Sequence, residues 1–386
     1  MGLSATYHPA WMDDEVRALG ELAAKFIAAE ITPHREEWEG RKGVDRDLWR
    51  KAGALGLLCC SIPEEYGGGG GTIAHDLVVQ HEQARALDMN WGVSVHSGIV
   101  AHYLLAYGTE GQKRRWLPGM ATGELVGAIA MTEPGAGSDL RNIATRAVRQ
   151  DDGSYRLTGS KVFISNGSQA DLVVVVAKTD PDAGSRGISL LVVETRGCPG
   201  FRRGRVLDKL GQHGADTSEL FFDDVVVRAE HLLGEWEGHG LHQLMAQLPQ
   251  ERLTIAVTAA GVTGRAVEDT TAYTKSRRAF GGPLFDLQNT RFELAECATL
   301  AHAIRVFTDS CVERHLAGGL DAATASMAKY WTTDVQCQVI DRCLQLHGGY
   351  GYMTEYPIAR LFADTRASRI YGGANEVMKE LIARSL

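Results

Sequence analysis

The sequence predicts an α+β protein of several domains: an N-terminal α-helical domain, a β-domain and a C-terminal helical bundle. Two observations support this fold class. Apolar residues recur at helical spacing in the first and last parts of the chain, whereas short β-branched runs separated by turns fill the middle. A chain of 386 residues is also long enough for two or three domains. We place the domains at residues 1–122, 123–234 and 235–386.

The first block has the pattern of an amphipathic helix near its start. Val16, Ala23, Phe26 and their apolar neighbours recur at steps of three and four residues, which gives one apolar stripe. Five consecutive glycines at 67–71 interrupt the block, and such a run is expected to form a loop.

The middle block contains three runs typical of strands. They read LVVVVA at 172–177, ISLLVVE at 188–194 and ELFFDDVVV at 219–227. No helices of useful length alternate with them, which disfavours a doubly wound nucleotide fold and predicts an antiparallel sheet or barrel. The two common nucleotide loops, GxGxxG after a strand and GxxxxGK[ST], are also missing from the sequence.

The last block is rich in Ala, Leu, Glu and Arg, which favour helices. Glycine pairs at 281–282, 318–319, 348–349 and 372–373 divide it. The intervals between these pairs give helix lengths suited to a bundle.

Composition excludes several classes of function. A net charge of −8 and a pI near 5.9 argue against a surface for nucleic acid or anionic membranes. No apolar run approaches the ~18 residues of a membrane span. The N-terminus lacks the apolar core of a signal peptide and the Arg-rich face of a transit peptide. Seven scattered cysteines with no CxxC pair predict buried thiols in a cytoplasmic protein and suggest no metal site.

The most informative stretch reads AMTEPGAGSD at 130–139. Its proline and glycines predict a tight turn with a backbone open to close approach, and Thr132 and Ser138 add hydroxyl groups. From the residues alone, a structural turn and a ligand-binding loop are about equally compatible with this pattern.

This stretch resembles the signature of acyl-CoA dehydrogenases, flavoenzymes that desaturate acyl-CoA thioesters, and most of all the long-chain type. Asn142 departs from the signature, where a small residue is usual. The likeness covers nearly the whole chain. It implies an α-domain, an antiparallel β-domain and a C-terminal four-helix bundle. It also implies FAD as cofactor, a homo-oligomer with a tetramer as precedent, and an electron-transferring flavoprotein as electron acceptor.

Three further segments resemble flavin contacts of the family. In a strand over this segment, alternation would point Phe163 and Ser165 to one face. The resemblance implies that Phe163 stacks on one flavin face and that Ser165 lies near the N5 and O4 edge. It sends Arg277 to the diphosphate of a neighbouring subunit, where a guanidinium pairs two phosphate oxygens. The third segment, QLHGG at 345–349, is a predicted helix end whose glycines admit close backbone contact. The structural alternatives for the three segments are a strand with one core aromatic, a solvated charge before a turn, and a helix C-cap. The FAD contacts implied by the resemblance are Ile129, Ala130, Met131, Thr132, Gly137, Ser138, Phe163, Ile164, Ser165, Arg277, Phe280, Gln288, Gln345, Leu346, His347, Gly348, Gly349, Ala374, Asn375 and Glu376.

The chemistry needs a carboxylate beside the α-carbon of the thioester. The loop at 370–373 reads IYGG, so the glutamate that most of the family carries there is absent. The long-chain and isovaleryl branches carry their base at the position matching Glu251, in LPQERL at 248–253. We therefore predict Glu251 as the base, with its pKa raised by desolvation, and the Gly372 backbone N–H as donor to the thioester oxygen. The structural alternative is that Pro249 opens or kinks a helix and Glu251 meets its dipole, an effect of only ~0.3–1 kcal/mol.

The residues that we predict to bind substrate are Ser138, Pro249, Gln250, Glu251, Arg252, Gly372 and Gly373. Arg252 either orients its surroundings, contacts CoA or forms a buried ion pair. His242 stands where long-chain relatives carry Tyr, and Ala374 replaces a Thr that binds flavin phosphate in the family.

The sequence thus predicts an FAD-dependent acyl-CoA dehydrogenase that makes trans-2-enoyl-CoA in fatty-acid β-oxidation. The alternatives are a branched-chain, isovaleryl-like dehydrogenase, a dehydrogenase of carrier-bound acyl groups, and a non-catalytic flavoprotein.

Overall fold

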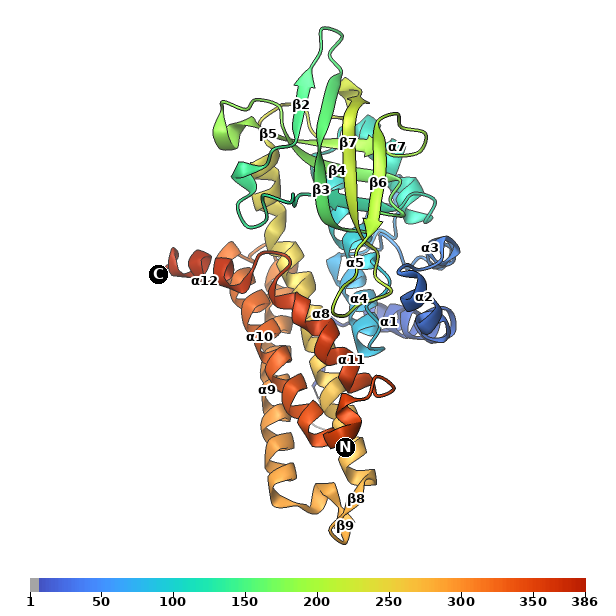
Figure 1. Ribbon diagram of the computed structural model, residues 1–386, viewed down its shortest axis with the longest axis vertical. Coiled ribbons are helices and arrows are strands. Elements are labelled where there is room, and N and C mark those ends of the chain that lie inside the picture. The colour runs from blue at the N-terminus through green and yellow to red at the C-terminus, as the bar shows by residue number, and fades with distance from the viewer. Residues whose placement is uncertain (1–6) are drawn as a thin grey trace.

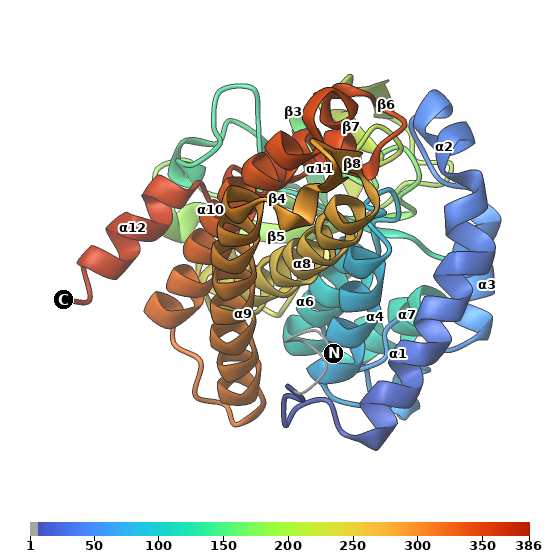
Figure 2. The same ribbon diagram turned by 90° about the horizontal axis from the view of Figure 1, so that it is seen from below.

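The N-terminal third of the chain is helical in the computed structural model, which describes residues 7–386. Asp13 caps the first helix through a hydrogen bond from the Val16 N–H, and the predicted stripe of Val16, Ala23 and Phe26 is buried. The α4 helix lies between α1 and α8 (Figure 2). The helices of this region are α1 (Asp14–Phe26), α2 (Arg35–Arg41), α3 (Arg46–Ala54), α4 (Ile73–Arg85), α5 (Val93–Val95), α6 (Ala101–Tyr107) and α7 (Glu110–Ala121).

The middle third forms one seven-stranded sheet, drawn in green at the top of Figure 1. Its order is β1-β4-β2-β3-β7-β6, and β5 pairs with β4. The strands are β1 (Gly127–Ala130), β2 (Arg146–Arg149), β3 (Tyr155–Ser165), β4 (Leu172–Lys178), β5 (Ile188–Glu194), β6 (Phe201–Val206) and β7 (Thr217–Val227).

The sheet is mixed rather than purely antiparallel, which corrects one detail of the sequence prediction. β1 runs parallel to β4 over four residue pairs, and β2 meets β4 in parallel at Arg146 and Lys178, while the other pairs are antiparallel. Strand periodicity reports which face a residue occupies but not the direction of the neighbouring strand. Because β2 and β3 lie between β1 and β4 along the chain, the sequence left this orientation undetermined.

β4 is buried on both faces, which explains its unbroken apolar sequence. Leu172, Val174 and Val176 pack in one apolar cluster with residues of α6 and α7. Val173 and Val175 point the other way, into a second cluster with β3 and β7. The central strand therefore joins the helical domain to the rest of the sheet.

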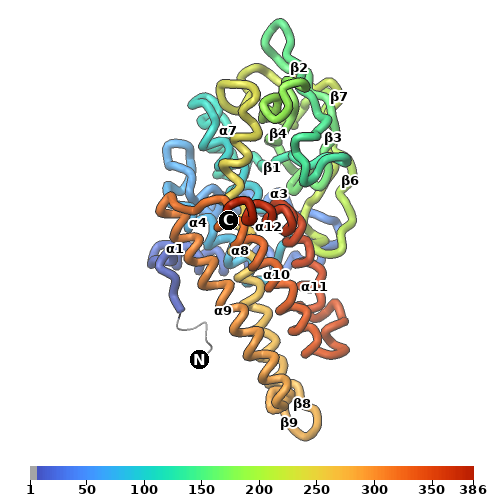
Figure 3. Tube along the Cα trace, turned by 90° about the vertical axis from the view of Figure 1, so that its left-hand side faces the viewer, coloured from blue at the N-terminus to red at the C-terminus, as the bar shows by residue number. Residues whose placement is uncertain are grey.

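The C-terminal third is the predicted helical bundle, built from three long helices and a short fourth. α8, α9 and α10 pack on one another, and α11 packs on α10 (Figure 1). α12 lies at the level where the bundle meets the sheet (Figure 3). The helices are α8 (Gly240–Ser276), α9 (Gln288–Leu316), α10 (Ala322–His347), α11 (Pro357–Asp364) and α12 (Asn375–Ala383), with a small hairpin of β8 (Arg278–Ala279) and β9 (Gly282–Pro283) after α8. Within residues 7–386, no helix has the length and apolar character needed to cross a bilayer.

Candidate active site

Glu251 lies on α8 where this helix passes α6. Its side chain is only 6% exposed, and its Oε1 accepts a hydrogen bond of 2.7 Å from the Tyr103 hydroxyl. α8 begins at Gly240, so Pro249 lies inside the helix and Glu251 is well beyond the first turn. The helix dipole acts mainly within the first turn, so the dipole explanation for Glu251 is wrong.

Burial gives Glu251 the acid–base property that a general base requires. Removal from water raises the pKa of Glu251 to about 7, even though the Tyr103 hydrogen bond and the charge of Arg252 oppose this rise. A carboxylate with such a pKa exchanges protons readily near neutral pH.

Gly372 is held in a backbone conformation that suits glycine. Its φ is 64°, and a Cβ placed there would lie 2.3 Å from the Cδ1 of Ile255. Ile255 is one turn beyond Glu251 on α8, so the two side chains share one face of this helix. The Gly372 backbone therefore faces the stretch of α8 that carries Glu251.

Lys329, which the sequence analysis did not identify, anchors the loop that contains Gly372. Its ammonium group is fully buried and donates to the Gly373 carbonyl at 2.7 Å and to Asn375 Oδ1 at 2.8 Å. Burial, followed by the charge of Arg252, lowers the pKa of Lys329 to about 8. Lys329 belongs to α10, so it fixes the loop to the bundle.

The side chain of Asn375 is engaged in hydrogen bonds within the protein, so the predicted cofactor contact of this residue remains a prediction for its backbone. It is buried, accepts from Lys329, and donates to Thr333 and Asp334 on α10 at 3.0 and 2.9 Å. These bonds occupy its donors and acceptor. Only the backbone of Asn375 remains available to a ligand.

Arg252 is also buried, and it contacts the bundle rather than the surface. Its Nη1 donates to Ser326 Oγ at 3.2 Å, while its Nε has no hydrogen-bond partner among the described residues. Burial lowers the pKa of Arg252. This position favours the predicted role of orienting the surroundings of Glu251 over a surface contact with CoA.

Gln250, predicted to bind substrate, is held by two other helical segments. Its Nε2 donates to the Gly98 carbonyl at 2.9 Å, and its Oε1 lies 3.2 Å from His315 Nε2 on α9. The side chain therefore bridges the segment before α6 and α9.

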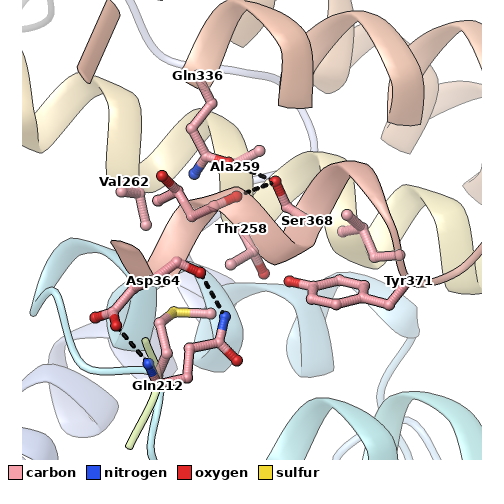
Figure 4. Close-up of a pocket in the computed structure, with 11 residues that line it drawn as sticks. Gln212, Thr258, Ala259, Val262, Gln336, Asp364, Ser368 and Tyr371 are labelled. Carbon is pink, nitrogen blue, oxygen red and sulfur yellow. Dashed lines mark hydrogen bonds between the residues drawn. The ribbon is translucent and has the colours of Figure 1, made fainter. Parts of the chain in front are cut away.

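The segment before Gly372 is tied to both the β-domain and the bundle (Figure 4). Gln212, which precedes β7, bonds Asp364 through its backbone N–H, and its Nε2 donates to the Asp364 carbonyl at 2.8 Å. Ser368 donates to Gln336 Oε1 on α10 at 3.0 Å. With Tyr371 these residues line a cavity of about 10 Å³, roughly the space of one water molecule.

The predicted tight turn after β1 is present. Glu133 and Ala136 exchange two backbone hydrogen bonds of 2.9 and 3.1 Å. The Glu133 carboxylate is buried and accepts from the Lys161 ammonium at 2.8 Å and from the Thr145 N–H at 3.0 Å. Lys161 also donates to the Met131 carbonyl at 3.0 Å, so this lysine fixes the start of the turn to β3.

The turn lies directly beside the segment that holds Phe163. The Val162 N–H donates to the Thr132 carbonyl at 3.0 Å. Regular alternation does not place Phe163, because the pairing of β3 with β7 is irregular between Lys161 and Ile164 and the φ of Phe163 is 61°. This bulge projects Phe163, which is 65% exposed, while Ile164 is buried.

The remaining predicted flavin contacts form a second, distant group at the other end of α8. Arg277 follows the last residue of α8, about 38 Å along the helix from Glu251. The His347 ring is buried and stacks on Tyr273 at 4.2 Å between centroids, so its side chain packs inside the bundle. Exposed residues of this group are Arg277, Phe280, Gln288, Gln345, Gly348 and Gly349.

The other predicted flavin contacts belong to β1, to the turn after it and to the start of α12. Ile129 and Ala130 end β1, and Met131, Gly137 and Ser138 belong to the turn that follows it. Ala374 and Glu376 flank Asn375 at the start of α12. The turn therefore lies beside Phe163, and Gly372 faces the stretch of α8 that carries Glu251, whereas Arg277 and QLHGG lie toward the other end of α8.

These two groups present surfaces that fit a flavin dinucleotide. Phe163 and Phe280 are large rings left outside the core, the latter 92% exposed. A Cβ added at Gly137, Gly348 or Gly349 would meet nothing within 4 Å, so a ligand can approach this backbone closely. Aromatic faces, open backbone and the Arg277 guanidinium match the stacking and phosphate contacts that a dinucleotide needs.

Comparison with protein families agrees with the fold and with this site. The acyl-CoA dehydrogenase N-terminal domain matches residues 13–124, the middle domain matches residues 128–225 and the C-terminal domain matches residues 238–386. The chain belongs to the acyl-CoA dehydrogenases, flavin-dependent oxidoreductases that act on acyl-CoA and use FAD.

Individual relatives resemble the chain over nearly its full length. The mitochondrial long-chain specific acyl-CoA dehydrogenase of Sus scrofa is 48% identical over 95% of this chain and 85% of its own. The crystal structure of an acyl-CoA dehydrogenase from Geobacillus kaustophilus superposes with a TM-score of 0.95 at 46% identity, covering 98% of this chain and 99% of that one. A glutaryl-CoA dehydrogenase from Mycobacterium smegmatis, solved in complex with FADH2, has a TM-score of 0.89 at 28% identity and covers 97% and 95%.

Proposed function

We propose that the protein oxidises long-chain acyl-CoA thioesters to trans-2-enoyl-CoA, with Glu251 as the base that removes the α-proton. The observation that carries this proposal is the pairing of Glu251 with Gly372. A buried carboxylate with a pKa raised to about 7 shares its helix face with Ile255, which contacts the left-handed Gly372. The 48% identity to a long-chain specific relative supports the choice of substrate.

The residues divide the reaction between a base and an oxyanion donor. Glu251 takes the α-proton of the thioester onto a carboxylate oxygen, and the Gly372 N–H donates to the thioester oxygen as negative charge develops there. Lys329 holds the loop through the Gly373 carbonyl, and Arg252, next to Glu251, bonds Ser326 of α10. When bound, FAD supplies the acceptor for the hydride that leaves the β-carbon.

The separation of the two groups of flavin contacts supports an oligomer. A distance of about 38 Å along α8 is longer than one dinucleotide reaches, so Arg277, Phe280 and QLHGG would contact the flavin of a neighbouring copy. We propose a homo-oligomer on this basis, and a homotetramer because the family offers that precedent. We also propose an electron-transferring flavoprotein as the acceptor of the electrons.

The proposal is tested by anaerobic flavin bleaching of the FAD-loaded protein with acyl-CoA substrates from C4 to C16 and with isovaleryl-CoA. The native protein should bleach with the long chains. Glu251→Gln should keep its yellow colour and lose about 10²–10⁴-fold in the rate of bleaching, the usual contribution of a general base. Glu82→Gln is the matched control, because burial also raises the pKa of Glu82 but this residue lies on α4.

Each alternative function has its own outcome. Fastest bleaching by isovaleryl-CoA would select the branched-chain reaction, and bleaching only by a carrier-bound acyl group would select the carrier substrate. A Glu251→Gln protein that bleaches at the native rate would contradict the assignment of the base. Absence of bleaching by any acyl group would favour a non-catalytic flavoprotein.

A further inference from the structure

We propose that Tyr103 is a positioning residue that anchors one oxygen of Glu251 and favours the charged form of this carboxylate, leaving the other oxygen for the substrate. This inference rests on the proposed role of Glu251. It adds a second residue, on a different helix, that determines when the base is active.

The two oxygens of Glu251 have different surroundings. Oε1 accepts the 2.7 Å hydrogen bond from the Tyr103 hydroxyl. Oε2 receives no hydrogen bond from any residue within 7–386. It also does not belong to the side-chain atoms of that range that are both shielded from solvent and without a partner. One oxygen is therefore held and the other is open to a proton from a ligand.

Tyr103 is itself held rigidly. Its side chain is fully buried in the apolar cluster that includes Leu104, Trp116 and Val174, and its ring contacts Tyr107 at 6.1 Å between centroids. A ring packed in this way cannot turn its hydroxyl elsewhere without disturbing the core. The hydroxyl is thus a fixed donor aimed at Glu251.

The proton of this hydrogen bond belongs to Tyr103. Burial and the nearby charge of Glu251 both raise the pKa of Tyr103 well above its ordinary value, so the phenol keeps its proton. A donor stabilises the charged carboxylate and lowers the pKa of Glu251 against the effect of burial. Without Tyr103, more of the base would be protonated, and therefore inactive, at neutral pH.

Among the described residues, few other charged or titratable groups affect the protonation of Glu251 and Tyr103. Among residues 7–386, Arg252, the next residue on α8, supplies the charge that favours the ionised base, and the charge of Arg252 also acts on Lys329 of α10. On α6, Tyr107 lies behind Tyr103 and donates to the Gln243 carbonyl at 3.2 Å rather than to Glu251. Tyr107 therefore offers a matched control that makes no contact with the base.

The test is the pH dependence of anaerobic flavin reduction by acyl-CoA in the FAD-loaded native, Tyr103→Phe and Tyr107→Phe proteins. Loss of a hydrogen bond to a charged group should move the midpoint of the rising limb about 1–2 pH units toward alkali in Tyr103→Phe. The rate should fall about 10-fold or more at pH 6.5 and recover by pH 9. Tyr107→Phe should keep the native midpoint.

A second variant protects the test from a folding defect. Site-specific replacement of Tyr103 by 3-fluorotyrosine preserves the shape of the ring and makes the phenol a stronger donor, so the midpoint should move toward acid. An unshifted midpoint in both Tyr103 variants would overturn this inference, even if Tyr103→Phe lost rate uniformly. Native reduction rates and an unchanged profile in Glu251→Gln would instead overturn the proposed function.

Discussion

Glu133 and Glu251 are each 6% exposed, but the protein surrounds them differently. Glu133 accepts hydrogen bonds from the Lys161 ammonium and from two backbone N–H groups, those of Ala144 and Thr145. Although burial acts to raise the pKa of Glu133, these bonds outweigh it and lower the pKa. Within the described part of the chain, Glu251 accepts a hydrogen bond from the Tyr103 hydroxyl alone, and its pKa rises to about 7.

The comparison shows that burial and hydrogen-bond partners together decide what a carboxylate inside the protein can do. A carboxylate with three donors, one of them charged, stays ionised and holds a structure together. A carboxylate with one neutral donor is poised to gain and lose a proton. The first stabilises the turn before the site, and the second is the candidate base.

The largest effect is expected from breaking the Glu133 pair. Lys161→Met leaves the Glu133 charge buried without its ammonium partner, so the free energy of unfolding should fall by about 3–5 kcal/mol. Chemical denaturation of the FAD-loaded protein at pH 7 measures this change. The double variant Glu133→Gln with Lys161→Met should regain part of the loss, because no unpaired charge remains. A loss below about 1 kcal/mol in Lys161→Met would show that the backbone donors alone satisfy Glu133.

Glu251→Gln should have the opposite effect on stability. The pKa of Glu251 is about 7 in the folded protein against an ordinary value of 4.5, so the folded state holds this proton longer than the unfolded state as pH rises. The side chain therefore lowers stability progressively between pH 4.5 and pH 7. Removing the charge should raise the free energy of unfolding at pH 8 by up to roughly 3 kcal/mol.

The pH dependence provides the control for this prediction. Near pH 4.5 the native and Glu251→Gln proteins should unfold with similar free energies, because the native carboxyl is then protonated in the folded state. A Glu251→Gln protein that is less stable than the native protein at pH 8 would contradict the account of a poised, weakly partnered carboxylate.

Periodicity in the sequence was sufficient to predict the order of helices, strands and helices. The helical stripe of Val16, Ala23 and Phe26 and the apolar runs of β4 and β5 are local patterns, and the structure confirms them. The parallel pairing of β1 with β4 was not predictable in this way, because it depends on how β2 and β3, which lie between them along the chain, join the sheet.

The site residues that the sequence revealed were also those with a local pattern, and the ones it missed depend on contacts between distant segments. Glu251 and Gly372 stood out through family motifs, whereas Lys161 and Lys329 are single lysines in mostly apolar stretches. Their partners Glu133 and Gly373 lie 28 and 44 residues away along the chain. A buried lysine gives no local signal of its partner, and the bulge at Phe163 likewise appears only when β3 pairs with β7.

The most direct measurement of the central claim isolates proton removal from flavin reduction. A 3-thia-acyl-CoA has sulfur at the β-position and cannot give up a hydride there, but its α-hydrogens can still exchange. In D2O the FAD-loaded native protein should incorporate deuterium at the α-carbon, detected by mass spectrometry. Glu251→Gln should exchange about 10²–10⁴-fold more slowly. Equal exchange by the two proteins would contradict Glu251 as the proton acceptor.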